Sequence, residues 1–502
     1  MLKTIIAREF LNNILNLRFM IGLVLCIIVT ITCIAILTQD YQQKMTDYKL
    51  RINAEDDLIR NYATSFVNLA GHTYASLHKI IHPQKPPERF RTLIIGIPGK
   101  EELESIDDNP LPVIFPPFDF LFIVTIIMSL LAMLFSHDTI TEERQSGTLR
   151  LAIANSISRT KILFGKFIGG IASLLIPFVL VLLIGVLYIS VNPAIQWDSS
   201  AWAEFGLLTA ASITFITLFY LLGLMVSTFS RYSSTSILNC LFLWVLLILV
   251  IPNISPYISA QLCRIPSIQE TKRKEQETEV LSYEVGKKLM KENVKQYRIK
   301  YGTLFAEFES MEFGDISSFF LGSNAGPEHK KAARQRAEAD PDFKVMVDAF
   351  RKELIKVIRE VERINNEFHN TVWKDLYRKA ALQTKLAKNM ACISPFANFV
   401  YIARDLTGTG LRSLKYFEQI KVEYKRQLFS YVMSKRHEEI KKNPKVGRHS
   451  SVDISDLPRF VFKEEALKDK LTVVLPYWGI LVLFNVVFFV SAFAGFMRYD
   501  VR

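Results

Sequence analysis

Six stretches of the chain carry no charged residue and are long enough to cross the hydrocarbon core of a bilayer. A transmembrane helix needs about 20 apolar residues and tolerates about 17. The stretches are residues 19–38, 120–136, 167–191, 205–229, 236–254 and 472–496. Because a soluble core rarely holds several uninterrupted apolar runs of this length, the pattern predicts an all-α polytopic membrane protein with six transmembrane helices.

The segment between the fifth and sixth stretches, residues 255–471, has the pattern of long charged helices. From residue 343 onward, apolar side chains recur at alternating spacings of four and three, which is typical of a coiled-coil seam. The seam consists of Phe343, Val347, Phe350, Leu354, Val357, Val361, Ile364 and Phe368. Asp340 and Pro341 supply an N-cap and a first-turn proline. We therefore expect a large helical, partly coiled-coil domain with a helix of about 50 residues, or about 75 Å.

A partner must cover this seam. Residues 270–308 and 411–442 are charged and compatible with helix formation, so either could pack on it within the chain, and a second subunit is the alternative. Residues 393–403 are apolar but too short to span a membrane. They either return to the membrane surface with their aromatic residues at the interface or form a core helix of the outer domain.

Basic residues in the short loops indicate the orientation, because Lys and Arg concentrate on the cytoplasmic side. They occur before the first stretch, between the second and third, between the fourth and fifth, and after the sixth, whereas residues 192–204 contain none. Both termini are therefore expected in the cytoplasm, and the membrane is expected to be a bacterial inner membrane. This topology makes 1–18, 137–166 and 497–502 cytoplasmic and 39–119 and 255–471 extracytoplasmic.

The charge is concentrated in one segment. The chain has a net charge of +12, and residues 253–472 alone hold 41 Lys and Arg against 30 Asp and Glu. On the extracytoplasmic side, this basic surface excludes nucleic acid as a partner. It could attract anionic lipid headgroups or an acidic protein, but interspersed charges of this kind are more typical of a solvated helical surface.

Two groups of side chains are candidates for a disulfide or a metal site. Cys263 and Cys392 both fall in the predicted outer domain, where a disulfide would be permitted. His72, His78 and His82 lie in the first outer segment, and the last two have the spacing of ligands on one helical face. No acidic or cysteine ligand accompanies these histidines, so surface histidines are favoured over a metal site.

The chain shows no sign of its own energy source or of an enzyme. No ionisable residue lies inside the six apolar stretches, although an ion-coupled carrier normally needs such groups. No GxxxxGK[ST] motif for ATP is present, and no nucleophile lies at a convincing spacing from a base. We therefore expect no catalytic residue, metal or cofactor in this chain, and an external source of energy.

The loop between the second and third stretches, residues 137–166, is longer and more polar than a connection requires. It contains paired acidic residues, a Gly-Thr-Leu break, a Ser-Arg pair and a Gly-Lys pair. These elements are Glu142, Glu143, Gly147, Thr148, Leu149, Ser158, Arg159, Gly165 and Lys166. With them the sequence resembles the permease subunits of type-2 ABC transporters, although Ser156 stands where that family often has proline. In layout it is similar to permeases with a large outer insertion, including those of multicopper-enzyme maturation.

The resemblance implies a function that depends on other subunits. In such permeases this loop docks on a separate ATPase subunit, present in two copies, which binds ATP and Mg²⁺. It also implies a second permease chain, the same or homologous, and an amphipathic elbow helix over residues 1–15. We expect Glu142, Glu143, Arg144 and Arg159 to contact the ATPase and Gly147 to supply a bend.

Two other functions stay open on the sequence alone. The assembly could transmit ATP-driven motion to an extracytoplasmic protein without transporting anything, because the spans lack polar residues that would line a path. The chain could also be a membrane scaffold or sensor that works without an ATPase. The elaborate polar loop argues against the scaffold.

Overall fold

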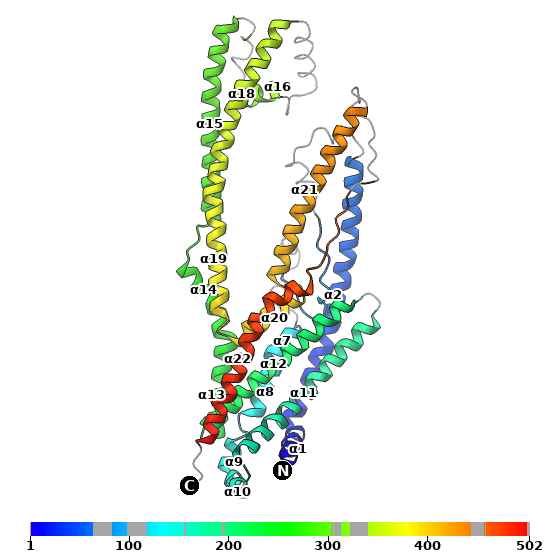
Figure 1. Cartoon of the computed structure of the whole chain (residues 1–502), viewed down its shortest axis with the longest axis vertical. Helices are drawn as coiled ribbons and strands as arrows, with labels where there is room; N and C mark the ends of the chain where they lie inside the picture. Colours follow the sequence, from blue (N-terminus) through cyan, green and yellow to red (C-terminus); the bar gives the residue numbers. More distant parts are fainter. Residues whose placement is uncertain are drawn as a thin grey trace. The chain divides into compact units, whose positions relative to one another are not determined.

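Every regular element in the described part of the chain is a helix. The computed structural model describes residues 2–63, 83–97, 118–154, 157–192, 195, 197–302, 305, 313–321, 340–442, 456 and 458–498. The chain divides into two compact units: residues 1–253 with 390–502, and residues 254–389. We describe each unit separately (Figure 1).

Among the described residues, six helical segments are long and apolar enough to cross a membrane, as the sequence predicted. The first is the start of α2 and the second is the run α7, η2, α8. The third and fourth are α11 and α12, the fifth is the run α13, η3, α14, and the sixth is α22. Their bounds are α2 Leu17–Ala63, α7 Phe120–Phe122, η2 Ile123–Met128, α8 Ser129–Ser136, α11 Arg159–Val191, α12 Ser199–Phe229, α13 Ser233–Val245, η3 Leu246–Val250, α14 Ile251–Leu262 and α22 Leu467–Met497.

The first unit also contains α1 (Leu2–Ile14), α9 (Thr141–Gln145), α10 (Thr148–Ala154), α20 (Pro395–Leu406) and α21 (Leu411–Lys442). Since six spans bring the chain back to its starting side, α1 and the end of α22 lie on one side of the membrane. We call it the terminal side and the opposite one the loop side. The helix α2 continues well past its apolar stretch into polar residues on the loop side.

The core of this unit is built around α12. Its Phe215, Phe219 and Tyr220 are fully buried, and it packs against α8, α20 and α22. The Tyr220 side chain packs against α11 at Gly170, where a Cβ atom would lie 2.0 Å from the tyrosine oxygen. Only glycine allows this close approach. In contrast, α2 leaves many apolar side chains such as Ile28 exposed, as a helix facing lipid would.

The apolar segment 393–403 belongs to the first unit, with the candidate membrane spans, and not to the unit of long helices. It forms α20, which packs against α12 and α22 in the first unit. Its Phe399 stacks on Phe215 with 4.8 Å between the ring centroids, and Ile402 is fully buried. The apolar face of α20 thus completes the core around the central span.

The six apolar stretches hold no Asp, Glu, Lys or Arg, as the sequence showed, but three of the helices begin before their apolar stretches and carry charged residues there. α11, α12 and α22 start early enough to include Lys166, Glu204 and Lys470. Glu204 and Lys470 form an ion pair of 2.5 Å, with side chains only 3% and 4% exposed, and the ammonium also donates to the carbonyl of Leu406. This pair joins two spans to the end of α20.

The second unit is a set of long helices in which the predicted seam finds a partner. It contains α15 (Ile268–Tyr301), α16 (Phe313–Leu321), α18 (Pro341–Phe368), η5 (His369–Trp373) and most of α19 (Lys374–Ala391). The Asp340 carboxylate accepts hydrogen bonds from two N–H groups of the first turn of α18. α18 packs along α15 (Figure 1). A coiled coil over the full length of the seam stays a prediction.

The α15–α18 contact is well packed. Phe343, Phe350 and Leu354 of α18 are buried with Met290 of α15. At Gly286 of α15, a Cβ atom would lie 2.9 Å from Val361 and 3.1 Å from the ring of Phe313. Residues 411–442, the other intramolecular candidate, form α21 in the first unit.

The sequence-based disulfide and histidine hypotheses have different outcomes. Cys263 and Cys392 are not joined by a disulfide bond in the structure, and Cys263 donates to the carbonyl of Lys379. Their pairing stays a prediction. His72, His78 and His82 lie outside the described residues.

Replacing Lys470 by methionine should destabilise the first unit. The substitution leaves the Glu204 carboxylate buried without its cation, which costs about 3–5 kcal/mol. We expect a lower melting temperature in detergent, with most of the loss recovered in the double variant with Glu204→Gln. Lys468→Met, exposed two residues earlier, is the control. Equal melting of Lys470→Met and wild type would contradict the ion pair.

Replacing Gly286 by leucine should loosen the α15–α18 contact, because the new side chain collides with Val361 and Phe313. Such overpacking costs about 1–3 kcal/mol. Amide hydrogen exchange in α15 and α18 should become faster. The same substitution at Gly314, where a Cβ atom meets nothing within 4 Å, should leave this exchange unchanged. Unchanged exchange in Gly286→Leu would show that the helices do not approach at this point.

Candidate functional site

The polar loop between the second and third spans folds into two short helices on the terminal side. They are α9 and α10, and Gly147 joins them with a φ of 77°. This left-handed conformation favours glycine, so Gly147 lies where the chain bends. Thr148 donates to the carbonyl of Glu143 across the bend, and Leu149 is fully buried. The loop is therefore compact.

One buried lysine ties this loop to two other helices. The Lys166 ammonium lies 3.2 Å from a carboxylate oxygen of Glu9 in α1 and 3.0 Å from one of Glu143 in α9. Its side chain is only 5% exposed. An isolated buried cation is very unfavourable, so two carboxylates in contact with it are a strong constraint on position. We call these three residues the Lys166 clasp.

The α1 helix reaches the clasp because α11 has glycines where the two helices cross. A Cβ atom on Gly165 would lie 2.6 Å from Ile5, and one on Gly169 would lie 2.8 Å from the carbonyl of Ile6. Burial raises the pKa of Glu9, and the neighbouring Lys166 opposes this shift. The carboxylate therefore depends on the lysine for its charge in this setting.

A second anchor holds the loop to the end of α12. The Arg144 guanidinium donates to the carbonyls of Ser230 at 2.7 Å and Thr228 at 3.1 Å. These belong to the last turn, where carbonyls lack helical partners and a cation is favoured. The Ser227 hydroxyl accepts from the N–H groups of Ile140 and Thr141 and so caps the start of α9.

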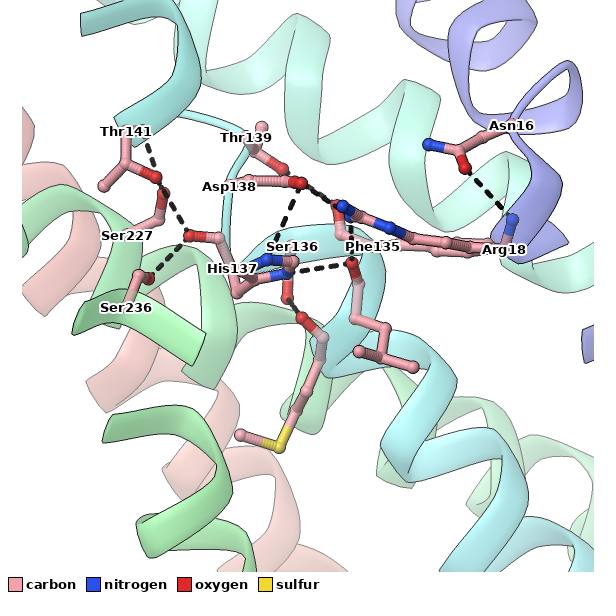
Figure 2. A network of polar contacts seen from close by, with 12 residues as sticks. Asn16, Arg18, Phe135, Ser136, His137, Asp138, Thr139, Thr141, Ser227 and Ser236 are labelled. Carbon is pink, nitrogen blue, oxygen red and sulfur yellow. Dashed lines mark hydrogen bonds and ion pairs between the residues drawn. The ribbon is translucent and has the colours of Figure 1, made fainter. Parts of the chain in front are cut away.

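A third anchor lies where α8 ends, and Figure 2 shows its contacts. Asp138 forms an ion pair of 2.6 Å with Arg18 at the start of α2. The backbone carbonyl of His137 accepts a hydrogen bond of 2.6 Å from Ser236 in α13. The terminal-side ends of α2, α8 and α13 are thereby fixed to one another and to the beginning of the loop.

The structure places the predicted site residues in different roles. Of the four expected polar contacts, Glu143 and Arg144 are engaged in the clasp and the second anchor, and Arg159 donates to the carbonyl of Met497. Glu142 is exposed. Ser158 caps α11 by accepting from the N–H of Lys161.

The sequence did not reveal the partners Glu9, Arg18 and Ser227. Each lies far along the chain from the group that it contacts, and only the fold brings them together. A partial signal was present for Glu9, an acidic residue in a segment expected to lie on the membrane surface.

A comparison with known protein families identifies the family of the chain. The chain matches the family described as ABC-2 family transporter protein over residues 3–501, which is nearly its whole length. No curated protein matches the chain. The match confirms the resemblance to type-2 ABC permeases that the loop residues and the six spans indicated. The chain belongs to the ABC-2 family of transporter proteins.

Proposed function

We propose that this protein is the permease subunit of an ATP-binding-cassette transporter, in which a separate ATPase subunit supplies the energy to move a substrate across the membrane. The observation that carries the proposal is the anchoring of the 137–166 loop. Its ion pairs and hydrogen bonds reach α1, α2, α11, α12 and α13, so a force on the loop acts on several membrane helices at once.

The face of the loop that remains exposed fits a protein partner. Leu149 of α10 is buried in the core, while Leu151 is 66% exposed. Four polar or charged residues of the same two helices are also exposed, namely Glu142, Gln145, Thr148 and Arg150. An exposed apolar residue within a polar rim is typical of a docking surface. We call this set the loop face and assign it to the ATPase.

The remaining parts of the proposal follow the family. The ATPase binds ATP and Mg²⁺ and is present in two copies, and a second permease chain, the same or homologous, completes the assembly. The terminal side is then the cytoplasmic side of a bacterial inner membrane, with both termini inside. This chain itself catalyses no reaction.

The anchors suggest how motion would pass through the loop. Displacement of α9 carries Glu143 and Arg144 with it. Glu143 acts on α11 through Lys166, and Arg144 acts on α12 through the carbonyls of its last turn. Because Glu9 holds the same lysine, α1 moves with α11 and the loop rather than sliding past them.

Replacing Lys166 by methionine should uncouple ATP hydrolysis from the membrane helices. Without the ammonium, the buried Glu9 carboxyl loses the cation that favours its charged form, and α9 loses its connection to α11 through Glu143. Substitutions on a coupling route change the coupling by about 0.5–2 kcal/mol, so we expect permease-stimulated ATP turnover to fall about tenfold. Lys161→Met, exposed on the same helix, is the control. Equal turnover in the two variants would contradict this role of the clasp.

Replacing Leu151 by aspartate should weaken docking of the ATPase, because it places a charge at the centre of the loop face. Loss of a central interface residue costs more than about 1 kcal/mol, so recovery of the ATPase with the purified permease should drop several-fold. Tyr232→Asp, exposed between α12 and α13 on the same side, is the control. Unchanged recovery with Leu151→Asp would place the docking surface elsewhere.

A further inference from the structure

Two of the membrane spans change from α- to π-helical geometry along their length. The second span contains η2 and the fifth contains η3. In η3 the N–H of Ile251 donates to the carbonyl of Leu246, five residues earlier rather than four. A π-turn widens the helix and leaves backbone groups in need of other partners, and such turns are frequent where a helix bends or functions.

In the fifth span, proline explains the π-turn. Pro252 has no N–H to donate to the carbonyl of Leu247, five residues before it. The Ser394 hydroxyl, from the N-cap of α20, donates to this carbonyl instead. The Asn253 side chain donates to the carbonyl of Leu249 at 2.7 Å. Two side chains therefore donate hydrogen bonds to backbone carbonyls of this π-turn.

In the second span, a serine has the same function. The Ser129 hydroxyl, directly after η2, donates to the carbonyl of Thr125, and the Thr125 hydroxyl donates to the carbonyl of Leu121 at 2.6 Å. All of these groups are buried. The local hydrogen bonds that keep this π-turn in place thus meet at Ser129.

The two π-turns are connected through this serine. The indole N–H of Trp244, two residues before η3, donates to the Ser129 oxygen at 2.9 Å, and both side chains are buried. The turns also lie at the same depth. Each is about three helical turns from the contact between Ser236 and the carbonyl of His137, which fixes the register of the two spans on the terminal side.

We propose that η2 and η3 form one hinge, at which the second and fifth spans bend together, and that the Trp244–Ser129 hydrogen bond joins the two bends. The Ser129 hydroxyl has two roles, since it donates to the carbonyl of Thr125 in its own span and accepts from Trp244 in the neighbouring span. A change in the geometry of one π-turn therefore alters the hydrogen bonding of the other. This inference concerns the two spans alone and stands whether or not an ATPase acts on the loop.

Amide hydrogen exchange of the whole protein in lipid nanodiscs tests the hinge. In Trp244→Phe, the ring remains but the donor to Ser129 is lost. We expect exchange to become about fivefold faster in both η2 and η3, as the loss of about one hydrogen bond implies. Ser129→Ala, which keeps the indole, should have the same effect on both segments.

Trp478→Phe is the matched control. It removes an indole donor to the Thr214 hydroxyl, a bond of 3.2 Å that joins the sixth and fourth spans. Faster exchange in this variant should be confined to those two spans. Exchange that rises only in η3 of Trp244→Phe would overturn the joint hinge. So would an equal rise in η2 and η3 in the control.

Discussion

The position of the polar loop depends on one cation held between two carboxylates. Lys166 lies at the start of the third span, and the fold surrounds it so completely that its charge must be balanced by Glu9 and Glu143. This requirement fixes a helix from the N-terminus, a membrane span and the loop relative to one another. Glycines on α11 make the arrangement possible, because Gly165 and Gly169 let α1 lie against the span.

The same principle holds on the loop side of the membrane unit. Glu204 and Lys470 are as deeply buried as the clasp, and they join the central span to the last one and to α20. The unit is thus tied by buried charge near both ends, with an apolar core between them. The two π-turns lie within that core, where the hydroxyls of Ser129 and Ser394 donate to backbone carbonyls of the turns. A membrane unit with ion pairs at its ends and two π-turns between them is suited to bend at those turns.

The sequence predicted the six spans because a transmembrane helix needs about 20 consecutive apolar residues, and such a run can be recognised within one segment of the chain. It also identified Lys166 and the loop through a motif. It did not predict the Glu204–Lys470 pair, since apolar stretches were ended at the first charge, and partners 266 residues apart leave no pattern. The sequence left the position of α20 open between the membrane surface and a protein core, because a short apolar helix has the same residue pattern in both places. Pro252 was a visible signal for η3 that a search for spans alone does not use.

The proposed function requires a separate ATPase to bind the anchored loop. This can be tested by affinity purification of the detergent-solubilised protein from its native membrane, with mass spectrometry of what remains bound. An ATPase subunit with a Walker motif is expected in the eluate. Recovery of extracytoplasmic proteins alone, without an ATPase, would contradict the proposed function.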